Sequence, residues 1–258
     1  GSSVIQFDGK SYPYSQTSDD YTKFYKVGKT FTNTAAFTGG NETGAFRLSI
    51  SDLNNHAITP NSELDRKTFN FNGTQTVIKN LDVNVVANYV LDNERNRSGL
   101  SDGPGDPNNV QFLAPNEAQS ILAPGHDANG KEVSFTNDIY VTNPYFAAYN
   151  FINNTRRERL ISSLSAKYSF TPWAYLQGRL GYDKINDSRL NVEPTGTAYL
   201  SGNGNLTEQT SQITEFNVDV LLGAKHDIIK DLLNLDLSIG GNIRKNNASG
   251  MSIGGSNI

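Results

Sequence analysis

Apolar and polar side chains alternate along residues 233–243, which read L-N-L-D-L-S-I-G-G-N-I. Successive side chains of a β-strand point to opposite faces of a sheet. One face of this stretch therefore carries Leu233, Leu235, Leu237, Ile239 and Ile243, and the other face carries Asn, Asp and Ser side chains. The same alternation recurs along the chain, so the sequence predicts strands with one apolar and one polar face.

Eight segments carry this pattern, and they fall into four pairs. The predicted strands are 29–38, 45–53, 66–77, 81–92, 159–170, 174–185, 213–225 and 233–245. Short turns such as Lys79-Asn80 and Thr171-Pro172-Trp173 join the strands within a pair. Longer polar connections at 54–65, 93–157 and 186–211 separate the pairs, and residues 116–122 predict one short capped helix.

This rhythm is typical of a transmembrane β-barrel. Each segment has about the length that crosses a bilayer as a tilted strand, roughly 9–11 residues. Short turns on one side of the membrane and long loops on the other are the arrangement of outer-membrane barrels. A soluble antiparallel sheet with one wet face predicts the same alternation and remains the alternative.

Composition removes several other classes of protein. The chain has no cysteine, which excludes disulfide scaffolds and thiolate metal sites. No stretch approaches the roughly 20 apolar residues of a spanning helix, and the first residues lack the features of a signal peptide. The net charge of −4 is mild and neither sign forms a block, so we expect no nucleic-acid partner.

Strand directions predict which side of the membrane each end of the chain occupies. If the short turns face the periplasm, residues 1–28 are the end of an extracellular loop and residues 246–258 start another. The span 29–245 is then a partial barrel wall. A complete single-chain barrel keeps both ends in the periplasm, so we expect this wall to belong to a larger barrel.

Residues 4–53 carry a specific resemblance to a known family. They include V-I-Q-F-D-G-K-S-Y-P-Y at 4–14, F-Y-K-V-G at 24–28, T-F-T-N-T at 30–34 and G-G-N-E at 39–42. This run resembles the SusC/RagA-type TonB-linked (TonB-dependent) outer membrane receptors of Bacteroidetes. There, an F-x-x-G-x-T-x-T-N segment enters the early barrel and an S-G-G-N-E turn follows. Later pieces also look similar, at 46–53, 58–62, 66–70, 143–145 and 157–160.

The resemblance covers essentially the whole chain, and it is weaker at 96–140 and 186–211. Ala57 departs from it, because the family has a glycine before the following I-x-P-N-S run. The resemblance implies a barrel of about 22 strands with a plugged lumen, of which this chain would form roughly strands two to nine. It implies import of oligosaccharides or peptides across the outer membrane of a Gram-negative bacterium, with energy from TonB and a SusD-like surface lipoprotein as partner. It implies no cofactor.

Two alternatives to nutrient uptake stay open. The parent protein could be a structural subunit of an outer membrane complex. The chain could instead be a soluble β-rich carbohydrate-binding or adhesin domain.

Two sets of residues are candidates for contact with a solute. The predicted lumen-facing set, which could equally bind the plug or water, is Arg47, Asn70, Asn72, Asn84, Asn88, Gln177, Arg179, Glu215 and Asp219. The second set contains loop aromatics that could stack on sugar rings, meet a lid protein or pack among themselves: Tyr12, Tyr14, Phe112, Tyr140, Tyr145, Phe146 and Tyr149.

Motifs for bond chemistry lack their companions, and we expect no enzyme. G-M-S-I-G at 250–254 matches a nucleophile elbow, but that motif needs a following helix and a paired His and acid. His56, His126 and His226 lie far apart in predicted loops or turns, without the spacing of a metal site. Calcium-loop fragments at 102–106 and 127–130 lack the closing Glu, so we interpret them as turns.

Overall fold

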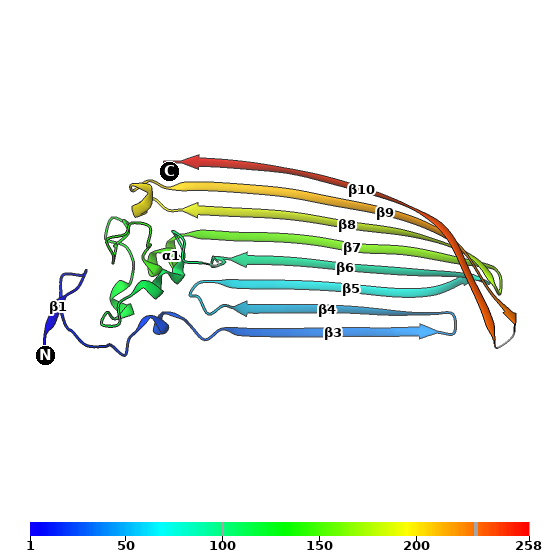
Figure 1. Cartoon of the computed structure of the whole chain (residues 1–258), viewed down its shortest axis with the longest axis horizontal. Helices are drawn as coiled ribbons and strands as arrows, with labels where there is room; N and C mark the ends of the chain where they lie inside the picture. The colour runs from blue at the N-terminus through cyan, green and yellow to red at the C-terminus, as the bar shows by residue number, and fades with distance from the viewer. Residues whose placement is uncertain (100, 230–231, 258) are drawn as a thin grey trace.

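A computed structural model of the chain describes residues 1–99, 101–229 and 232–257. Leu100, in the predicted long loop, and Ile258, the last residue of the predicted C-terminal loop, lie outside the described residues. The molecule is a single long antiparallel sheet with a cluster of loops and short helices at one end (Figure 1). Both chain ends lie at that loop end (Figure 1).

The sheet contains eight strands in the order β10-β9-β8-β7-β6-β5-β4-β3, so each strand pairs with its sequence neighbour. The strands are β3 (Lys29–Asn41), β4 (Gly44–His56), β5 (Glu63–Ile78), β6 (Leu81–Arg95), β7 (Ile152–Thr171), β8 (Ala174–Glu193), β9 (Asn205–Ile229) and β10 (Leu233–Ser256). The all-β class and the eight antiparallel strands are confirmed. The outer strands are β3 and β10.

The remaining elements are short and lie in the connections. They are a hairpin of β1 (Ser3–Ile5) and β2 (Ser11–Pro13), one helix α1 (Pro144–Asn150), and the 3-10 turns η1 (Tyr21–Phe24), η2 (Pro107–Phe112), η3 (Gln119–Leu122) and η4 (Ala198–Leu200). The helix predicted at 116–122 is only the 3-10 turn η3. Among the described residues no helix is long and apolar enough to span a membrane.

The strands run further toward the loop end than the sequence pattern indicates. Residues 246–256, predicted to start a loop, continue β10, and the predicted loop at 186–211 shrinks to 194–204. The prediction fails there because polar side chains occupy both faces, as in T-S-Q at 210–212, and no two-residue period remains. The backbone ladder between β8 and β9 nevertheless continues to the Glu193–Asn205 pair.

The short turns form at the predicted places. Asn80 adopts a left-handed conformation (φ 71°), which Asn tolerates better than most residues, and it closes the β5–β6 turn. At the β7–β8 turn the Thr171 hydroxyl accepts hydrogen bonds from the amides of Trp173 (3.3 Å) and Ala174 (3.0 Å).

The four hairpin turns are staggered along the strands. One continuous row of backbone partners runs from Gly44, next to the first turn, to Gly241 on β10. β10 begins at Leu233, at its hairpin end, eight residues before Gly241 (241 − 233 = 8). At about 3.4 Å per residue and about 4.8 Å between strands, eight residues over six strand steps correspond to a tilt of about 43° if the turns share one level. Membrane barrels have strand tilts of about 35–45°.

Candidate functional site

The strand register sorts the side chains of the sheet onto two faces, which we call the polar face and the apolar face. Direct pairs join Arg47 to Asn72, Asn70 to Asn88, and Arg179 to Asp219. Together with the two-residue period, these pairs place all nine predicted lumen-facing residues on one face, the polar face. That this face lines a lumen stays a prediction.

The apolar face lies on the opposite side of the same strands. One of its rows of direct partners is Phe46, Gly73, Val85, Leu164, Leu180, Val218 and Ile243. Among the described residues no second sheet covers it, and Leu180 (43%), Val220 (49%) and Ile243 (74%) are exposed. On β6 its apolar residues run from Leu81 to Leu91, about 34 Å along the strand and about 25 Å at a tilt of 43°. Outer-membrane barrels carry an apolar band of about 25 Å.

Arginine–carboxylate pairs connect neighbouring strands across the polar face. Arg66 holds Asp92 with two hydrogen bonds, Nε to Oδ1 at 2.6 Å and Nη2 to Oδ2 at 2.9 Å. Further pairs join β7 to β8, β8 to β9 and β9 to β10: Arg159–Asp183, Arg179–Asp219 and Arg244–Glu215. The Arg159–Asp183 pair also has two hydrogen bonds, and such bidentate contacts fix side-chain geometry as well as charge.

Near the loop end these pairs merge into one row of alternating charge. Arg66, Asp92, Arg157 and Asp187 are direct partners on β5, β6, β7 and β8. The Asp92 and Asp187 side chains are only 10% and 9% exposed, and Arg189 also reaches Asp187 at 2.9 Å. We call Arg66, Asp92, Arg157, Asp187 and Arg189 the charge row.

Sequence reasoning missed the charge row. The predicted strands end at residue 92 and begin at residue 159, so Arg157 fell in a loop. Extending the alternation by one residue pair would have placed Arg157 on the face of Arg159, because both have the same parity. Arg47, a predicted residue, lies opposite Asn72 and forms no ion pair with the part of the chain that the structure describes.

The connection 96–151 folds against residues 1–28 into a small packed cap with two clusters of buried side chains. One contains Phe24, Val110 and Ala148, and the other contains Leu113, Leu122 and Phe135. Hydrogen bonds tie the two segments together, including Gln6 Nε2 to the Asn116 carbonyl (2.8 Å) and Gln119 Nε2 to Asp19 Oδ1 (2.7 Å). The cap is therefore an ordered structure and not an open loop.

Asn143 is the polar centre of this cap and is completely buried. Its Oδ1 accepts from the amides of Tyr145 (3.0 Å) and Phe146 (3.4 Å) at the start of α1. Its Nδ2 donates to the carbonyls of Leu122 (3.1 Å) and Val133 (2.9 Å). An Asn followed by Pro144 is a helix-start signal, and it could have identified α1 from the sequence.

Glu132 joins the cap to the second connection, 194–204. Its Oε1 accepts from the Asn143 amide (2.8 Å) and its Oε2 accepts from the Ala198 amide (2.9 Å). Burial raises the pKa of the Glu132 carboxyl, while these two backbone hydrogen bonds act in the opposite direction. Tyr140 stacks on Tyr199 across the same junction, with ring centroids 6.3 Å apart.

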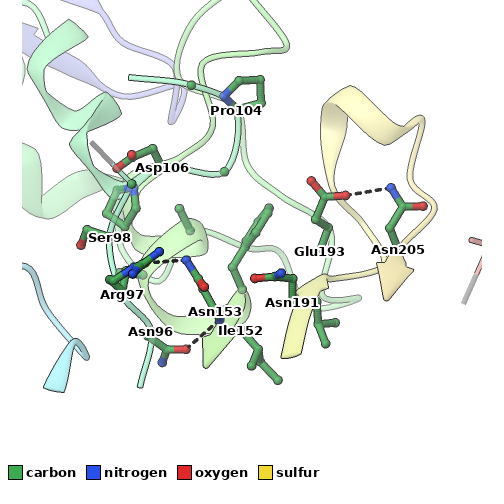
Figure 2. Close-up of a pocket in the computed structure, with 18 of the residues that line it drawn as sticks. Asn96, Arg97, Ser98, Pro104, Asp106, Ile152, Asn153, Asn191, Glu193 and Asn205 are labelled. Carbon is green, nitrogen blue, oxygen red and sulfur yellow. Dashed lines mark hydrogen bonds between the residues drawn. The ribbon is translucent and has the colours of Figure 1, made fainter. Parts of the chain in front are cut away.

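A pocket of about 520 Å³ opens where the cap meets the ends of β7, β8 and β9. Figure 2 shows that its walls carry amide, carboxylate and guanidinium groups. Asn153 Nδ2 donates to the Arg97 carbonyl (2.8 Å), and Asn205 Nδ2 donates to Glu193 Oε2 (2.7 Å) (Figure 2). Burial raises the pKa of Asp106, another wall residue. These groups suit the amides of a peptide or the hydroxyls of a sugar.

The predicted loop aromatics divide into buried and exposed residues. Phe146 is completely buried and Tyr145 packs against both clusters, so of the three alternatives these two rings take the packing within the loops. The Tyr12 hydroxyl donates to Asp8. Four rings remain largely exposed at the loop end: Tyr14, Phe112, Tyr140 and Tyr149.

The other sequence motifs do not assemble into a site. Residues 250–254 lie within β10, so neither the elbow nor the loop predicted from residue 246 forms there. His56 and His226 lie in strands and not in loops. Asp127 Oδ1 accepts from the amides of Asn129 and Lys131, which confirms a turn. The described residues contain no group of three His, Asp or Glu side chains that could hold a metal.

Solved structures show what this arrangement resembles. The sheet and cap superimpose on the RagAB peptide importer in its "closed-closed" state with a TM-score of 0.74, over 100% of this chain and 28% of that chain. The "open-open" state gives a TM-score of 0.76 over 99% and 28%, and the RagAB peptide transporter gives 0.70 over 100% and 28%. The chain has the fold of one section of these importers.

The likeness is one of fold. Sequence identity to all three RagAB chains is 15%. No protein-family model matches the sequence, and no curated protein does. The chain spans 28% of the length of the importer chains that it matches, so the function of a whole transporter comes to it only as a proposal.

Proposed function

We propose that this chain is a section of the barrel wall of a SusC/RagA-type, TonB-dependent importer in the outer membrane. In this proposal the apolar face meets lipid, the polar face lines the lumen, and the cap lies at the extracellular mouth. The protein moves peptides or oligosaccharides together with a SusD-like lipoprotein and catalyses no bond change. TonB acts through parts of the protein outside this chain.

The observation that carries the proposal is the agreement between stagger and band height. The stagger of the turns corresponds to a strand tilt of about 43°, and that tilt converts the apolar run on β6 into a band of about 25 Å. Both quantities match a membrane barrel. The soluble-domain alternative accounts for neither quantity, and it leaves a large apolar face without a cover.

The polar face supports passage of a solute and not chemistry. Except for Arg47, its arginines are paired with carboxylates, most of them on neighbouring strands, so this face presents many hydrogen-bonding groups with little net charge. Weak, distributed polar contacts let a solute enter and leave. The pocket beside the cap offers a first contact for such a solute at the mouth.

Growth of a deletion strain tests the transport proposal. The gene for the full-length protein is deleted, and growth is measured on peptides or on oligosaccharides as the only nutrient. We expect a growth defect on one of these classes that the wild-type gene restores and that loss of TonB reproduces. Normal growth on both classes, with the protein still in the outer membrane, would favour a structural subunit. Recovery of the protein in the soluble fraction would favour a binding domain.

A further inference from the structure

Two lysines mark the upper edge of the apolar face on β8 and β10. Lys184 follows Tyr182 by two residues on β8, and Lys245 lies directly opposite Phe216 on β9. On the apolar face, each strand carries a run of apolar side chains, and the lysine is the first polar side chain after that run toward the loop end. Both ammonium groups therefore stand next to an aromatic residue at the boundary between the apolar and the polar parts of the face.

The strand register places the two lysines close to one another. Lys184 pairs with Thr214, and Thr214 pairs with Asn247, the residue two positions after Lys245. The two lysines are thus two strands and two residues apart, about 12 Å between Cα atoms from standard sheet dimensions. Two flexible four-carbon stems can bring both ammonium groups to one anion between them.

In the described residues one carboxylate of the apolar face lies close to this pair: Glu158 on β7, two residues before Leu160, the direct partner of Lys184. Neither lysine forms an ion pair there, whereas the Arg156 guanidinium on the same face is held by Glu158 at 2.7 Å. The neighbouring side chains of this face on β9 and β10 are Thr214, Gln212, Asn247 and Ser249, all uncharged. The site therefore has two positive charges and several hydrogen-bonding groups around them.

Lys67 on β5 provides an internal comparison. It also stands two residues above an aromatic ring of the apolar face, that of Phe69. Its direct partner on β4 is Asp52, which supplies a negative charge on the same face. Lys29 on β3 stands two residues above Phe31 in the same way, and its direct partner is His56. The Lys184–Lys245 pair therefore differs from these single edge lysines in bringing two cations together.

We infer that Lys184 and Lys245 bind the phosphate of a membrane lipid headgroup, with Thr214 and Asn247 as hydrogen-bonding neighbours. The lipid source follows from continuity with the apolar run below, where acyl chains would lie against Val218 and Ile243 while the phosphate meets the lysines. This inference rests on the proposed membrane location. It adds a lipid site on the outside of the wall that is separate from the solute path.

Native mass spectrometry of the full-length protein tests this site, with lipid A as the probe. We expect the wild type to retain lipid A and the double variant K184Q/K245Q to retain about 25-fold less, since each lysine near an anionic surface contributes roughly fivefold. The matched control is K167Q, because Lys167 lies on the polar face over the Tyr175 ring. That variant is expected to retain lipid A like the wild type.

Two further arms separate the outcomes. Dephosphorylated lipid A is expected to bind the wild type as weakly as it binds the double variant, and millimolar inorganic phosphate is expected not to displace lipid A. Equal retention by wild type and double variant, or displacement by free phosphate, would overturn the lipid site. Failure of the wild type to float with vesicles would instead overturn the membrane location, so the two failures are distinguishable.

Discussion

Arg66 and Asp92 face each other across β5 and β6 and share two hydrogen bonds, of 2.6 and 2.9 Å. The Asp92 side chain is 10% exposed, so its carboxylate has little water to replace the guanidinium. The same carboxylate lies opposite Arg157 in the sheet. The pair therefore anchors one end of the charge row.

A double-mutant cycle on this pair is expected to show strong coupling. Asp92→Asn alone leaves Arg66 with an unpaired charge, and we expect it to lower the free energy of unfolding by about 3 kcal/mol. Adding Arg66→Gln is expected to recover part of that loss, with a coupling energy of about 1–3 kcal/mol. Urea unfolding of the full-length protein in detergent provides the measurement.

The Arg244–Glu215 pair on β9 and β10 is the control for that cycle. Arg244 is 61% exposed, and exposed ion pairs contribute little to stability, so we expect weaker coupling here. Equal coupling in both cycles would show that burial of Asp92 does not strengthen its ion pair.

Adjacent valines on β6 test which face meets lipid. Val85 lies on the apolar face opposite Leu164, and Val86 lies on the polar face opposite Asn72. We expect Val85→Arg to destabilise the folded barrel by about 2–4 kcal/mol, because an arginine near the middle of the bilayer loses its hydration. Val86→Arg should be tolerated far better. Folding into vesicles, followed by gel mobility without heating, reports both variants, and equal effects would contradict the lipid-facing assignment.

Asn143 is expected to control the order of the cap. Asn143→Ala removes the partners of two buried carbonyls and two amides at the start of α1. We expect a local loss of about 2–4 kcal/mol, seen as faster hydrogen exchange over residues 144–150. Asn129→Ala, in an exposed turn, is the matched control. Unchanged exchange at 144–150 in the Asn143 variant would show that the cap holds without this residue.

The junction between the two connections is expected to weaken as pH rises. Because burial raises the pKa of Glu132 above its ordinary value of 4.5, the folded junction binds more protons than the unfolded chain above that pH. The contribution of Glu132 to the stability of the junction is then fully present below pH 4.5, and it is lost as the pH rises through the pKa of the folded state. Hydrogen exchange at the amides of Asn143 and Ala198, corrected for intrinsic rates, measures this decline.

Glu132→Gln separates titration from simple loss of contact. Glutamine has one acceptor oxygen for two amides, so we expect lower protection that no longer changes with pH. Glu42→Gln, in the exposed β3–β4 turn, should leave the wild-type decline in place. A decline that persists in the Glu132 variant would assign the pH dependence to another group.

The sequence predicts the sheet better than it predicts the cap and the loop end of the strands. The eight strands and their turns follow from two-residue alternation, since one face of each strand is apolar. Above the apolar run both faces are polar, and the pattern disappears although the backbone ladder continues to Ser256. Burial of Glu132 and Phe146 depends on contacts between segments far apart in the chain, so no local pattern indicates it.

The unequal outer strands restrict what can lie beside this sheet. An edge strand leaves about half of its amides and carbonyls without partners, and in hydrocarbon each such group costs several kcal/mol. The outer strands are β3, with 13 residues, and β10, with 24 residues. In a bilayer the strands that join β3 and β10 must pair with them along the part that crosses the hydrocarbon, whereas water can satisfy the backbone groups of β10 that lie above the lipid. If this sheet is a barrel wall, its edge at the loop end rises from β3 to β10.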